Sequence, residues 1–283
     1  MNVFIFGVGL IGGSLALDMK SLFPKVVIYG IDQDLQNLAY AKANGVIDHM
    51  AAFEDLPKAD VVVLSVPVNV IVKKIKDILD VVSENCLVFD VGSTKEGICK
   101  CIESHPNREV FLAAHPIAGT EFSGSEAALH HLFRGKANIL CEIEKTGEAQ
   151  KKLALDLFKK MGMRIRYMQP APHDKHIAYV SHLSHVSSFM LGKTVIEEEK
   201  NEKNIFDMAG SGFASTVRLA KSSPAMWTPI FDQNKDNVVQ ALEEYIQNLT
   251  TFKTLLETGQ KEAIFEEMQN TNKIKAILEG INK

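Results

Sequence analysis

The sequence predicts an α/β domain followed by an all-α domain, and three observations support this prediction. Short β-branched runs alternate with amphipathic stretches over residues 1–168. The run Gln169-Pro170-Ala171-Pro172 then interrupts the pattern, and beyond it only long helical patterns remain. Strands that alternate with helices in this way are typical of a parallel sheet with right-handed crossovers.

The size and charge of the chain restrict its class. Its 283 residues suffice for two modest domains, since a domain usually holds about 100–200 residues. Hydrophobic residues make up 46% and charged residues 23%, which is typical of a globular protein with a packed core. The formal net charge is −4. Nucleic acids and anionic membranes bind basic surfaces, so this charge balance favours neither as a partner.

Neither export nor a membrane location is expected. The longest apolar stretch, residues 59–72, is broken by Asp60, Ser65 and Pro67 and is too short to cross a bilayer. The chain starts directly in a strand-like run, without the charged region and cleavage site of a signal peptide.

The cysteines agree with a cytoplasmic protein. Cys86, Cys99, Cys101 and Cys141 have neither the spacing of a disulfide framework nor that of a zinc site. We therefore expect free thiols in a reducing compartment and no bound metal.

Seven runs of β-branched and apolar residues predict the strands of the first domain. They are Val3–Phe6, Val26–Ile31, Val61–Val66, Leu87–Val91, Val110–Ala113, Ala137–Ile143 and Arg164–Met168. Two of the stretches between them, Asp34–Ala43 and Thr146–Met161, are amphipathic. Both are followed by typical helix stop signals, Asn44-Gly45 and Gly162.

The second domain, residues 169–283, is predicted to be entirely helical. Helical patterns run over residues 172–199, 212–221, 234–257 and 260–280, and no strand-like run, repeat or low-complexity segment interrupts them.

A glycine-rich motif follows the first strand. Gly7-Val8-Gly9-Leu10-Ile11-Gly12 has the G-x-G-x-x-G spacing and opens a predicted helix. Gly7 allows a tight turn, Gly9 lets the backbone approach a pyrophosphate, and Gly12 permits close packing of helix on strand. The spacing alone is weak evidence. In this position it predicts a Rossmann-type, doubly wound parallel sheet that binds a dinucleotide at a helix N-terminus.

Further side chains at strand ends support the dinucleotide site. Asp32 ends the second strand, 20 residues beyond Gly12, where a carboxylate accepts hydrogen bonds from a ribose 2′-hydroxyl and repels a 2′-phosphate. NAD is therefore favoured over NADP, and a helix-capping or turn aspartate is the alternative. Ser65-Val66-Pro67 and Asp90–Ser93 close two further strands, at the edge where open parallel sheets bind their ligands.

His115 is the first candidate for chemistry. It begins the segment His115-Pro116-Ile117-Ala118-Gly119-Thr120-Glu121, directly after the fifth predicted strand. A histidine beside a cofactor cleft titrates near neutrality and accepts the proton of an alcohol. The alternative is a structural histidine that binds its own loop.

Four further histidines lie on one predicted helix: His173, His176, His182 and His185. At about 100° per residue, His182 and His185 share a face, whereas His173 and His176 project near the opposite side. Opposed faces cannot supply one coordination sphere, so a metal site is not favoured. The face that carries His182 and His185 instead fits the lining of a cleft or a contact between domains.

Arg218 and Trp227 form the third candidate. The arginine precedes the only tryptophan by nine residues. Its guanidinium can bind a carboxylate beside an apolar wall. A surface arginine and a core tryptophan are the alternative.

Together these motifs resemble the prephenate dehydrogenase family of tyrosine biosynthesis, which includes the arogenate dehydrogenases. The resemblance rests on Gly7–Ser14, Asp90–Lys95, His115–Glu121, Ser181–His185 and Arg218–Trp227, which occur in family order and at family-like spacing. Only roughly the last 30 residues carry no matching motif. The His-Pro-Ile-Ala-Gly-x-Glu segment is highly specific, whereas the glycine loop alone is not.

The resemblance implies a role for each site residue. His115 corresponds to the histidine that hydrogen-bonds the ring hydroxyl of prephenate and assists its deprotonation. Ser93 corresponds to the serine that orients this hydroxyl and the histidine. Arg218 corresponds to the arginine that anchors a substrate carboxylate. The residues that correspond to the lining or gate of the substrate pocket are His182, His185, Glu121 and Trp227.

The implied reaction is the NAD-dependent oxidative decarboxylation of prephenate to 4-hydroxyphenylpyruvate, CO₂ and NADH. Arogenate is the alternative substrate, and prephenate is preferred because Asp32 suggests NAD. A β-hydroxyacid dehydrogenase would place a lysine on the first interdomain helix, where this chain offers His182 and His185 and, near the helix end, Lys193. A non-catalytic NAD-binding sensor would need neither the base nor the anion clamp.

The resemblance also implies a homodimer in which the helical domains, residues 169–283 here, interlock. Ala214-Ser215 stands where a Lys-Asp pair often precedes the family arginine, so a charged gate at the dimer interface is not expected. The chain is too short for a fused chorismate mutase or a regulatory ACT domain. Any feedback control by tyrosine would then act at the active site.

Overall fold

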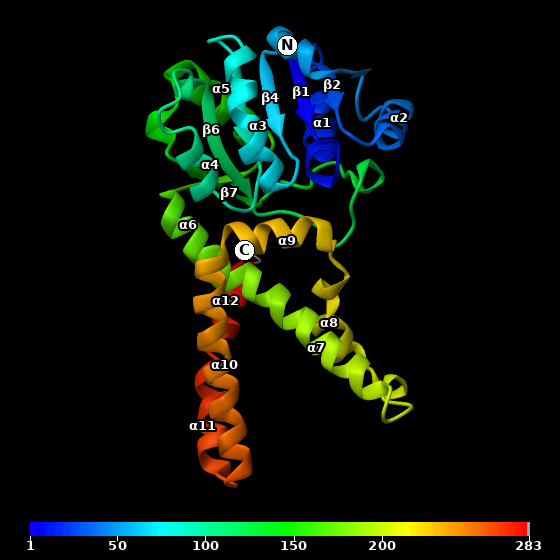
Figure 1. Ribbon diagram of the computed structural model, residues 1–283, viewed down its shortest axis with the longest axis vertical. Helices are drawn as coiled ribbons and strands as arrows, with labels where there is room; N and C mark the ends of the chain where they lie inside the picture. Colours follow the sequence, from blue (N-terminus) through cyan, green and yellow to red (C-terminus); the bar gives the residue numbers. More distant parts are fainter. Residues whose placement is uncertain (282–283) are drawn as a thin grey trace. The chain divides into compact units, whose positions relative to one another are not determined.

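The computed structural model describes residues 1–281, which form two compact units that divide between Lys235 and Asp236. The first unit contains a sheet with helices on both faces, followed by a helical segment (Figure 1). The second unit is helical.

An eight-stranded sheet forms the centre of the first unit. Its strands are β1 (Asn2–Phe6), β2 (Val27–Ile31), β3 (His49–Met50), β4 (Val61–Leu64), β5 (Leu87–Asp90), β6 (Phe111–Pro116), β7 (Ala137–Cys141) and β8 (Arg164–Met168). They are arranged in the order β3-β2-β1-β4-β5-β6-β7-β8. All seven predicted strands are therefore confirmed, and the two-residue strand β3 is the one that the sequence did not reveal.

The sheet reverses direction once, and the expectation of a purely parallel sheet is wrong at this pairing. Strand β7 runs antiparallel to β6, with His115 opposite Ile139, and β8 runs parallel to β7. The connection over residues 117–136 contains one short 3₁₀ turn and no crossover helix. Ile117 N–H donates to Ala137 O at 2.8 Å, so the chain re-enters the sheet beside the end of the strand it has left.

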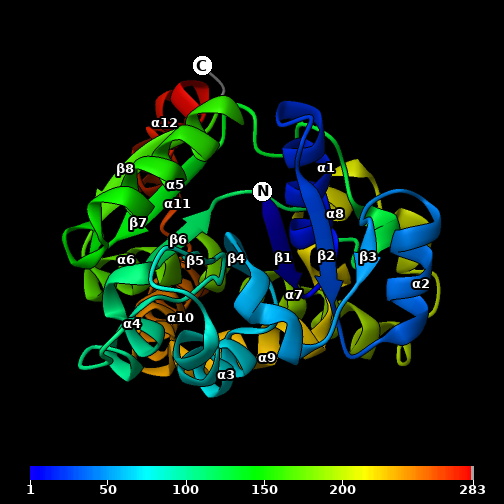
Figure 2. The ribbon, with the colours of Figure 1, turned by 90° about the horizontal axis from the view of Figure 1, so that it is seen from above.

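Helices cover both faces of the sheet. On one side α1 (Leu10–Leu22), α2 (Leu35–Ala43) and α5 (Glu148–Lys160) bury their apolar residues in one core. On the other side α3 (Val68–Val81) and α4 (Glu96–Cys101) contribute to a second core. Figure 2 shows α1 and α5 on one side of the strands and α3 and α4 on the other. The predicted doubly wound α/β architecture is confirmed.

The sequence pattern explains these two cores. Successive side chains of a strand point to opposite faces, so Val3 and Ile5 enter one core and Phe4 enters the other. In α3 the buried residues Ile71, Ile75 and Ile78 recur at intervals of three or four, which places them on one helix face. Both strand faces are buried, as is typical of a parallel sheet.

Beyond β8 the described part of the chain contains helices joined by turns and no strand. The first unit continues with α6 (Pro170–Ile177), α7 (Leu183–Glu199), α8 (Ser211–Thr216) and α9 (Pro224–Gln233), and α10 (Lys235–Glu257), α11 (Lys261–Thr271) and α12 (Ile274–Ile281) follow. Short 3₁₀ turns occur at Phe53–Lys58, Arg108–Val110, Ser125–Ala127, Ile143–Lys145, Phe206–Met208 and Arg218–Lys221.

Two details of the helical segment differ from the sequence prediction. The helix expected over residues 172–199 is two helices, because a π-helical turn, Ala178–His182, separates α6 from α7. Helix α9 was not predicted, since Pro224 and Pro229 resemble helix breakers in the sequence. Pro224 occupies the first turn of α9, where a missing N–H costs no hydrogen bond.

None of the described helices combines the length and the apolar character that a membrane span requires.

The turn between β1 and α1 requires glycine at two positions. Gly7 has φ +96°, in the left-handed region that glycine favours. A Cβ atom on Gly12 would lie 2.2 Å from the Gly7 carbonyl oxygen and 2.4 Å from Ser65 Oγ. The helix therefore packs too closely on the strand ends for any side chain at this position.

We predict that Gly12→Ala lowers the free energy of unfolding by about 1–3 kcal/mol, because the new methyl group forces backbone apart. Urea unfolding followed by circular dichroism measures this. Gly9→Ala is the matched control, since a Cβ at Gly9 meets no atom within 4 Å. Equal midpoints for Gly12→Ala and the unaltered chain would contradict the close-packing argument.

Candidate active site

The predicted site residues of the first domain converge at one edge of the sheet. The glycine turn follows β1, Ser65 follows β4, Ser93 follows β5, and His115 lies near the end of β6. Because these four strands are parallel neighbours, their carboxyl ends lie side by side.

The glycine turn leaves room for a phosphate group. Gly9 precedes α1 and borders open space, since a Cβ there would meet nothing within 4 Å. The first turn of a helix carries unpaired backbone N–H groups, which bind anions. Leu10 is buried and Ile11 is half-buried on this turn. The turn therefore fits the pyrophosphate of a dinucleotide.

Asp32 holds the glycine turn directly. Its Oδ2 accepts a hydrogen bond from Val8 N–H at 2.9 Å, and its Oδ1 accepts one from Asp34 N–H at 3.0 Å. Asn37 Nδ2 donates to Val8 O at 2.8 Å and to Asp32 Oδ2 at 3.3 Å. The half-buried carboxylate thus lies at the end of β2 beside the turn, as the sequence predicts for a ribose-binding residue.

Ser65 supports the same turn from β4. Its hydroxyl donates to Gly7 O at 2.7 Å, and its backbone N–H donates to Phe6 O at 2.8 Å. Val66 is half-buried and lies beside the turn, since its Cγ1 would be 2.7 Å from a Cβ atom on Gly7, and the exposed Pro67 follows it in the chain.

His115 is 8% exposed and contacts a second histidine. Its Nδ1 lies 2.9 Å from His173 Nε2. Burial lowers the pKa of His115 well below that of an ordinary histidine, and His173, Lys95 and His182 nearby lower this pKa further. The expectation that His115 titrates near neutrality is therefore wrong, because its burial disfavours the charged form. His115 is neutral near pH 7 and retains a nitrogen lone pair that can accept a proton.

The placement of His173 corrects the expectation that it lies opposite His182. That expectation assumed one continuous α-helix. The π-helical turn between α6 and α7 shifts the register of the helix, as π-bulges at functional sites commonly do. Both His173 and His182 consequently lie near enough to His115 to lower its pKa.

The polar groups that bind His173 were not predicted from the sequence. Asp174 Oδ1 lies 2.7 Å from His173 Nδ1 and accepts a hydrogen bond from Lys95 N–H at 2.8 Å. Lys95 is fully buried and forms an ion pair with Asp90. The motif Asp90–Lys95 was visible in the sequence, but the burial of its lysine was not.

His182, His185 and Trp227 form an aromatic cluster. His185 stacks on Trp227 with a centroid distance of 3.5 Å, and His182 meets the same indole edge-on at 5.7 Å. Asn234 Nδ2 donates to His182 Nδ1 at 3.1 Å. Burial lowers the pKa of His182 to about 4. These three predicted pocket residues are therefore brought together.

Two polar atoms of this cluster have no hydrogen-bond partner within the described part of the chain. They are His182 Nε2 and Trp227 Nε1, and both are buried. A buried polar atom without a partner carries a desolvation cost of about 1–3 kcal/mol. A ligand with polar groups would remove this cost.

Arg218 lies at an exposed position near Glu121. Its Nη1 is 3.5 Å from Glu121 Oε2, and the two side chains are 52% and 23% exposed. Burial lowers the pKa of His185, and the Arg218 guanidinium lowers it further, which places Arg218 near the aromatic cluster. The predicted anion-binding arginine and the predicted gating glutamate thus form an ion pair.

Ser93 is half-buried on the loop after β5. The next residue, Thr94, donates its hydroxyl hydrogen to Gln233 Oε1 at 2.8 Å. This contact joins the loop of Ser93 to the end of α9, so the loop has a fixed position between sheet and helical segment.

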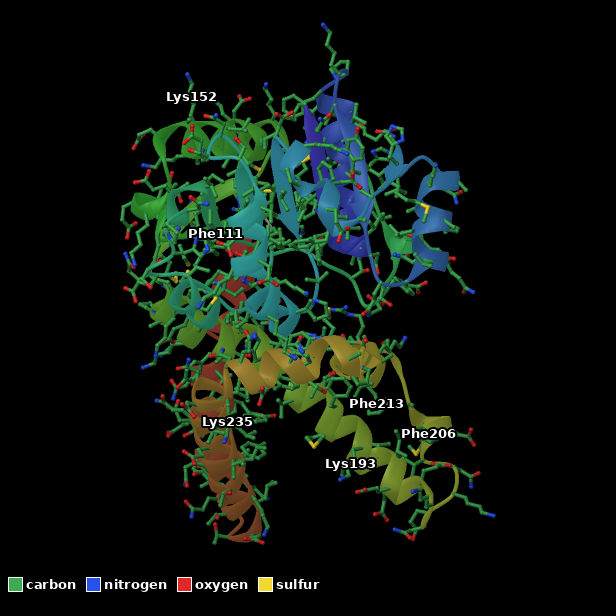
Figure 3. All side chains as sticks on the ribbon, turned by 45° about the horizontal axis from the view of Figure 1, so that its top comes forward. Phe111, Lys152, Lys193, Phe206, Phe213 and Lys235 are labelled. Carbon is green, nitrogen blue, oxygen red and sulfur yellow. The ribbon has the colours of Figure 1, made fainter. Side chains whose placement is uncertain are left out.

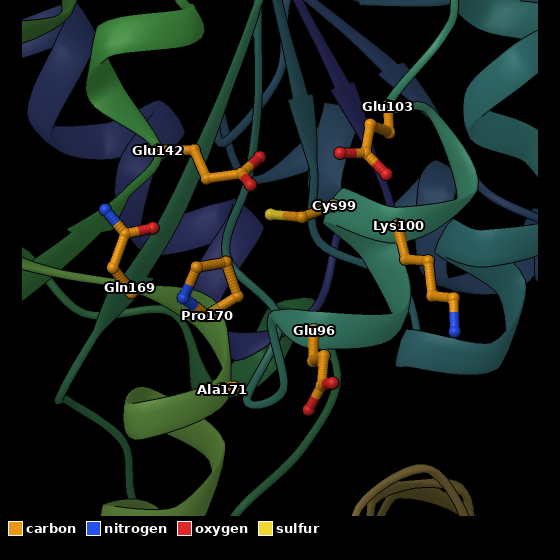
Figure 4. Close-up of a pocket in the computed structure, with 8 residues that line it drawn as sticks. All are labelled: Glu96, Cys99, Lys100, Glu103, Glu142, Gln169, Pro170 and Ala171. Carbon is orange, nitrogen blue, oxygen red and sulfur yellow. The ribbon is translucent and has the colours of Figure 1, made fainter.

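A separate cavity of about 250 Å³ contains Cys99. Figure 4 shows its sulfur pointing into the space between Glu142 and Pro170, with Glu96 and Lys100 on the same helix. Burial raises the pKa of the Cys99 thiol, so it is protonated and a poor nucleophile.

All four cysteines are free thiols. No cluster of three or more His, Cys, Asp or Glu side chains suited to a metal occurs among the described residues.

Lys193, the alternative acid/base residue, lies on α7 (Figure 3). Its side chain is 61% exposed, and Nζ lies 3.7 Å from Glu197 Oε1. It borders an apolar groove of about 410 Å³ between α7 and α9 that also contains Phe189 and Phe231. Lys193 is therefore a solvated lysine and not part of the His115 site.

Two family models match the chain in succession. The model described as the nucleotide-binding domain of prephenate dehydrogenase matches residues 15–167. The model described as the dimerization domain of prephenate dehydrogenase matches residues 169–270.

The chain belongs to the prephenate dehydrogenase family. Prephenate dehydrogenase of Bacillus subtilis (strain 168) is 30% identical over 272 residues, which are 93% of this chain and 72% of the relative. The resemblance inferred from the motifs is confirmed, and the chain is an NAD-dependent oxidoreductase of this family.

Solved structures agree with this assignment. Prephenate dehydrogenase from Aquifex aeolicus, solved with hydroxyphenyl propionate and NAD⁺, has a TM-score of 0.86 and 34% identity, and the match covers 98% of this chain and 97% of that one. Arogenate dehydrogenase from Synechocystis has a TM-score of 0.75 and 26% identity, with 98% and 100% covered. The family therefore includes proteins named for either substrate.

Proposed function

We propose that this chain catalyses the NAD-dependent oxidative decarboxylation of prephenate to 4-hydroxyphenylpyruvate in tyrosine biosynthesis. The observation that carries the proposal is the buried, neutral His115 at the carboxyl edge of the sheet, beside the glycine turn. A neutral histidine there serves as the acceptor for the proton of a substrate hydroxyl.

The residues at the glycine turn fit NAD. Gly7, Gly9 and Gly12 hold the pyrophosphate against the start of α1, with Leu10 and Ile11 on the same turn. Asp32 binds the adenosine ribose and disfavours the 2′-phosphate of NADP. Ser65, Val66 and Pro67, at the end of β4, would border the dinucleotide. The nicotinamide ring of NAD supplies the hydride acceptor.

His115 and Ser93 act at the ring hydroxyl of the substrate. Ser93 orients the hydroxyl, and His115 accepts its proton while C4 loses a hydride. Loss of CO₂ sends an electron pair into the ring, which becomes aromatic, and a proton returns to the oxygen. Orientation of the reacting groups lowers the barrier by up to roughly 7–11 kcal/mol.

Arg218 anchors a substrate carboxylate at the entrance of the site. Its guanidinium offers several N–H donors to a carboxylate, and Glu121 occupies this position in the free chain. A substrate carboxylate would displace Glu121, which makes the glutamate a gate. His182, His185 and Trp227 line the pocket, and the unpaired His182 Nε2 and Trp227 Nε1 offer it polar contacts.

The domain roles follow the family models. We assign NAD binding to residues 1–168, and substrate binding and dimerisation to residues 169–283. Exposed apolar residues in this segment, such as Val180, Met190 and Ile196, support a homodimer. The four free thiols support a cytoplasmic location.

The decisive assay is NADH formation with prephenate, arogenate and a panel of 3-hydroxy acids as separate substrates. We expect turnover with prephenate, and 4-hydroxyphenylpyruvate as product. Faster turnover of arogenate, with tyrosine as product, would replace the proposed substrate. Activity confined to 3-hydroxy acids would refute the proposal, and no turnover at all would favour an NAD-binding sensor.

We predict that His115→Asn lowers kcat by about 10²–10⁴-fold with little change in KM, because it removes a positioned base. In the unaltered enzyme, kcat/KM should fall with acid only below pH 6.5, since burial lowers the pKa of His115 and protonation removes its acceptor. Steady-state kinetics from pH 5 to 9 test both statements. His176→Asn, at an exposed position on α6, is the control. Near-normal kcat in His115→Asn would exclude this residue from catalysis.

We predict that Arg218→Gln raises KM for prephenate by about 10-fold or more, because a charge-assisted hydrogen bond stabilises a complex by about 1.5–3 kcal/mol. KM for NAD should stay within about twofold of normal. Lys221→Gln removes an exposed cation from the same 3₁₀ turn and should leave both constants unchanged. An unchanged KM for prephenate in Arg218→Gln would contradict the anchoring role.

A further inference from the structure

The environment of His115 decides which of its two nitrogens carries the proton. A neutral imidazole has one N–H and one lone pair, and the partner of one nitrogen fixes the role of the other. His115 Nδ1 lies 2.9 Å from His173 Nε2, whereas Nε2 of His115 has no hydrogen-bond partner in the described part of the chain. The protonation of His173 therefore determines whether His115 Nε2 is a base.

Asp174 fixes the protonation of His173. Its two carboxylate oxygens accept hydrogen bonds from Lys95 N–H at 2.8 Å and Glu96 N–H at 2.9 Å. Backbone N–H groups can only donate, so they hold this carboxylate in the role of an acceptor. Asp174 Oδ1 lies 2.7 Å from His173 Nδ1, which must then carry the proton. In neutral His173 the lone pair is then on Nε2, whereas an imidazolium would donate from Nε2 to His115 Nδ1.

The lone pair on His173 Nε2 requires a donor, and His115 Nδ1 is the group within reach. His115 is then protonated at Nδ1 and unprotonated at Nε2. The direction of each hydrogen bond from Asp174 to His115 thus follows from two conditions: the backbone donors that bind Asp174, and a neutral His173.

The surrounding contacts hold this series in place. Asn234 Nδ2 donates to the Asp174 carbonyl oxygen at 2.7 Å, and His173 and Asp174 are 3% and 2% exposed. On the other side, Lys95 Nζ donates to Ala114 O, directly before His115, at 2.8 Å. Neither histidine can therefore turn its ring without breaking buried hydrogen bonds.

We propose that His173 and Asp174 are positioning residues that keep His115 in the Nδ1–H tautomer, with Nε2 free to accept the proton of the substrate hydroxyl. The inference rests on the proposed role of His115 as the base. It assigns the catalytic atom, Nε2, and explains why a buried aspartate lies two hydrogen bonds away from the reacting group.

The tautomer can be measured without any assay of activity. Protein labelled with ¹⁵N-histidine and studied by long-range ¹H–¹⁵N correlation at pH 7.5 distinguishes Nδ1–H from Nε2–H, and the signals of His115 are assigned with His115→Asn. We expect the Nδ1–H form for His115 in the unaltered protein. An Nε2–H form there would overturn the proposal, whatever the variants do.

Variants of His173 test the effect on catalysis. His173→Leu removes the acceptor and should shift His115 towards Nε2–H, with kcat lowered by about 10–100-fold and KM for prephenate within about threefold of normal. His173→Gln keeps an oxygen acceptor at a similar position and should restore both the tautomer and most of kcat. His176→Gln, on the exposed face of α6, is the control.

The outcomes separate this inference from the function on which it rests. If His115→Asn loses activity but His173→Leu changes neither the tautomer nor kcat, His173 is a packing residue and the inference is wrong. If His115→Asn keeps normal kcat, the proposed base itself is wrong. Should His173→Leu fail to fold, His173→Phe decides, because it keeps a ring at this position and lacks the acceptor. An unchanged Nδ1–H form of His115 in that variant would contradict the proposal.

Discussion

Lys95 and Asp90 form a fully buried ion pair where β5, β6 and the start of α4 meet. Asp90 also accepts hydrogen bonds from Gly92 N–H and Ala114 N–H, and Lys95 donates to Ala114 O. A buried charge that loses its partner destabilises a protein by about 3–5 kcal/mol, so neither residue is dispensable alone. The pair fixes the loop of Ser93 on one side and the backbone before His115 on the other. Its geometry therefore sets the position of the proposed catalytic groups.

The sequence predicted the architecture of the first domain well because its signals are local. Each of these signals predicts one strand, turn or helix from neighbouring residues alone. Examples are the run Val3–Phe6, the glycine turn and the spacing of the isoleucines in α3. The reversal at β7 was missed because strand direction depends on the path of residues 117–136, which a β-branched run does not encode. Strand β3 has two residues, too few for any periodic pattern.

The site residues also fall into two groups: those that the local sequence predicts, and those whose roles depend on contacts between distant parts of the chain. His115, Arg218 and Asp32 stand out in the sequence because their residue types and neighbours suggest chemistry. Asp174 was overlooked and His173 was placed away from the site, since their roles arise from contacts with residues 79 and 58 positions away in the chain. The face assigned to His173 was wrong because a constant 100° per residue does not hold through a π-helical turn.

The π-helical turn Ala178–His182 also limits how the chain can vary in length. Loops usually tolerate an added or lost residue, because only their ends are fixed. The segment from His173 to His182 differs from a loop, because both of its end residues have buried side chains. The number of residues between them sets the angle between the two side chains around the helix axis. A deletion that restored a regular α-helix would keep every histidine in the sequence and still turn one of them away. In this segment, related sequences should therefore differ in residue type far more readily than in length.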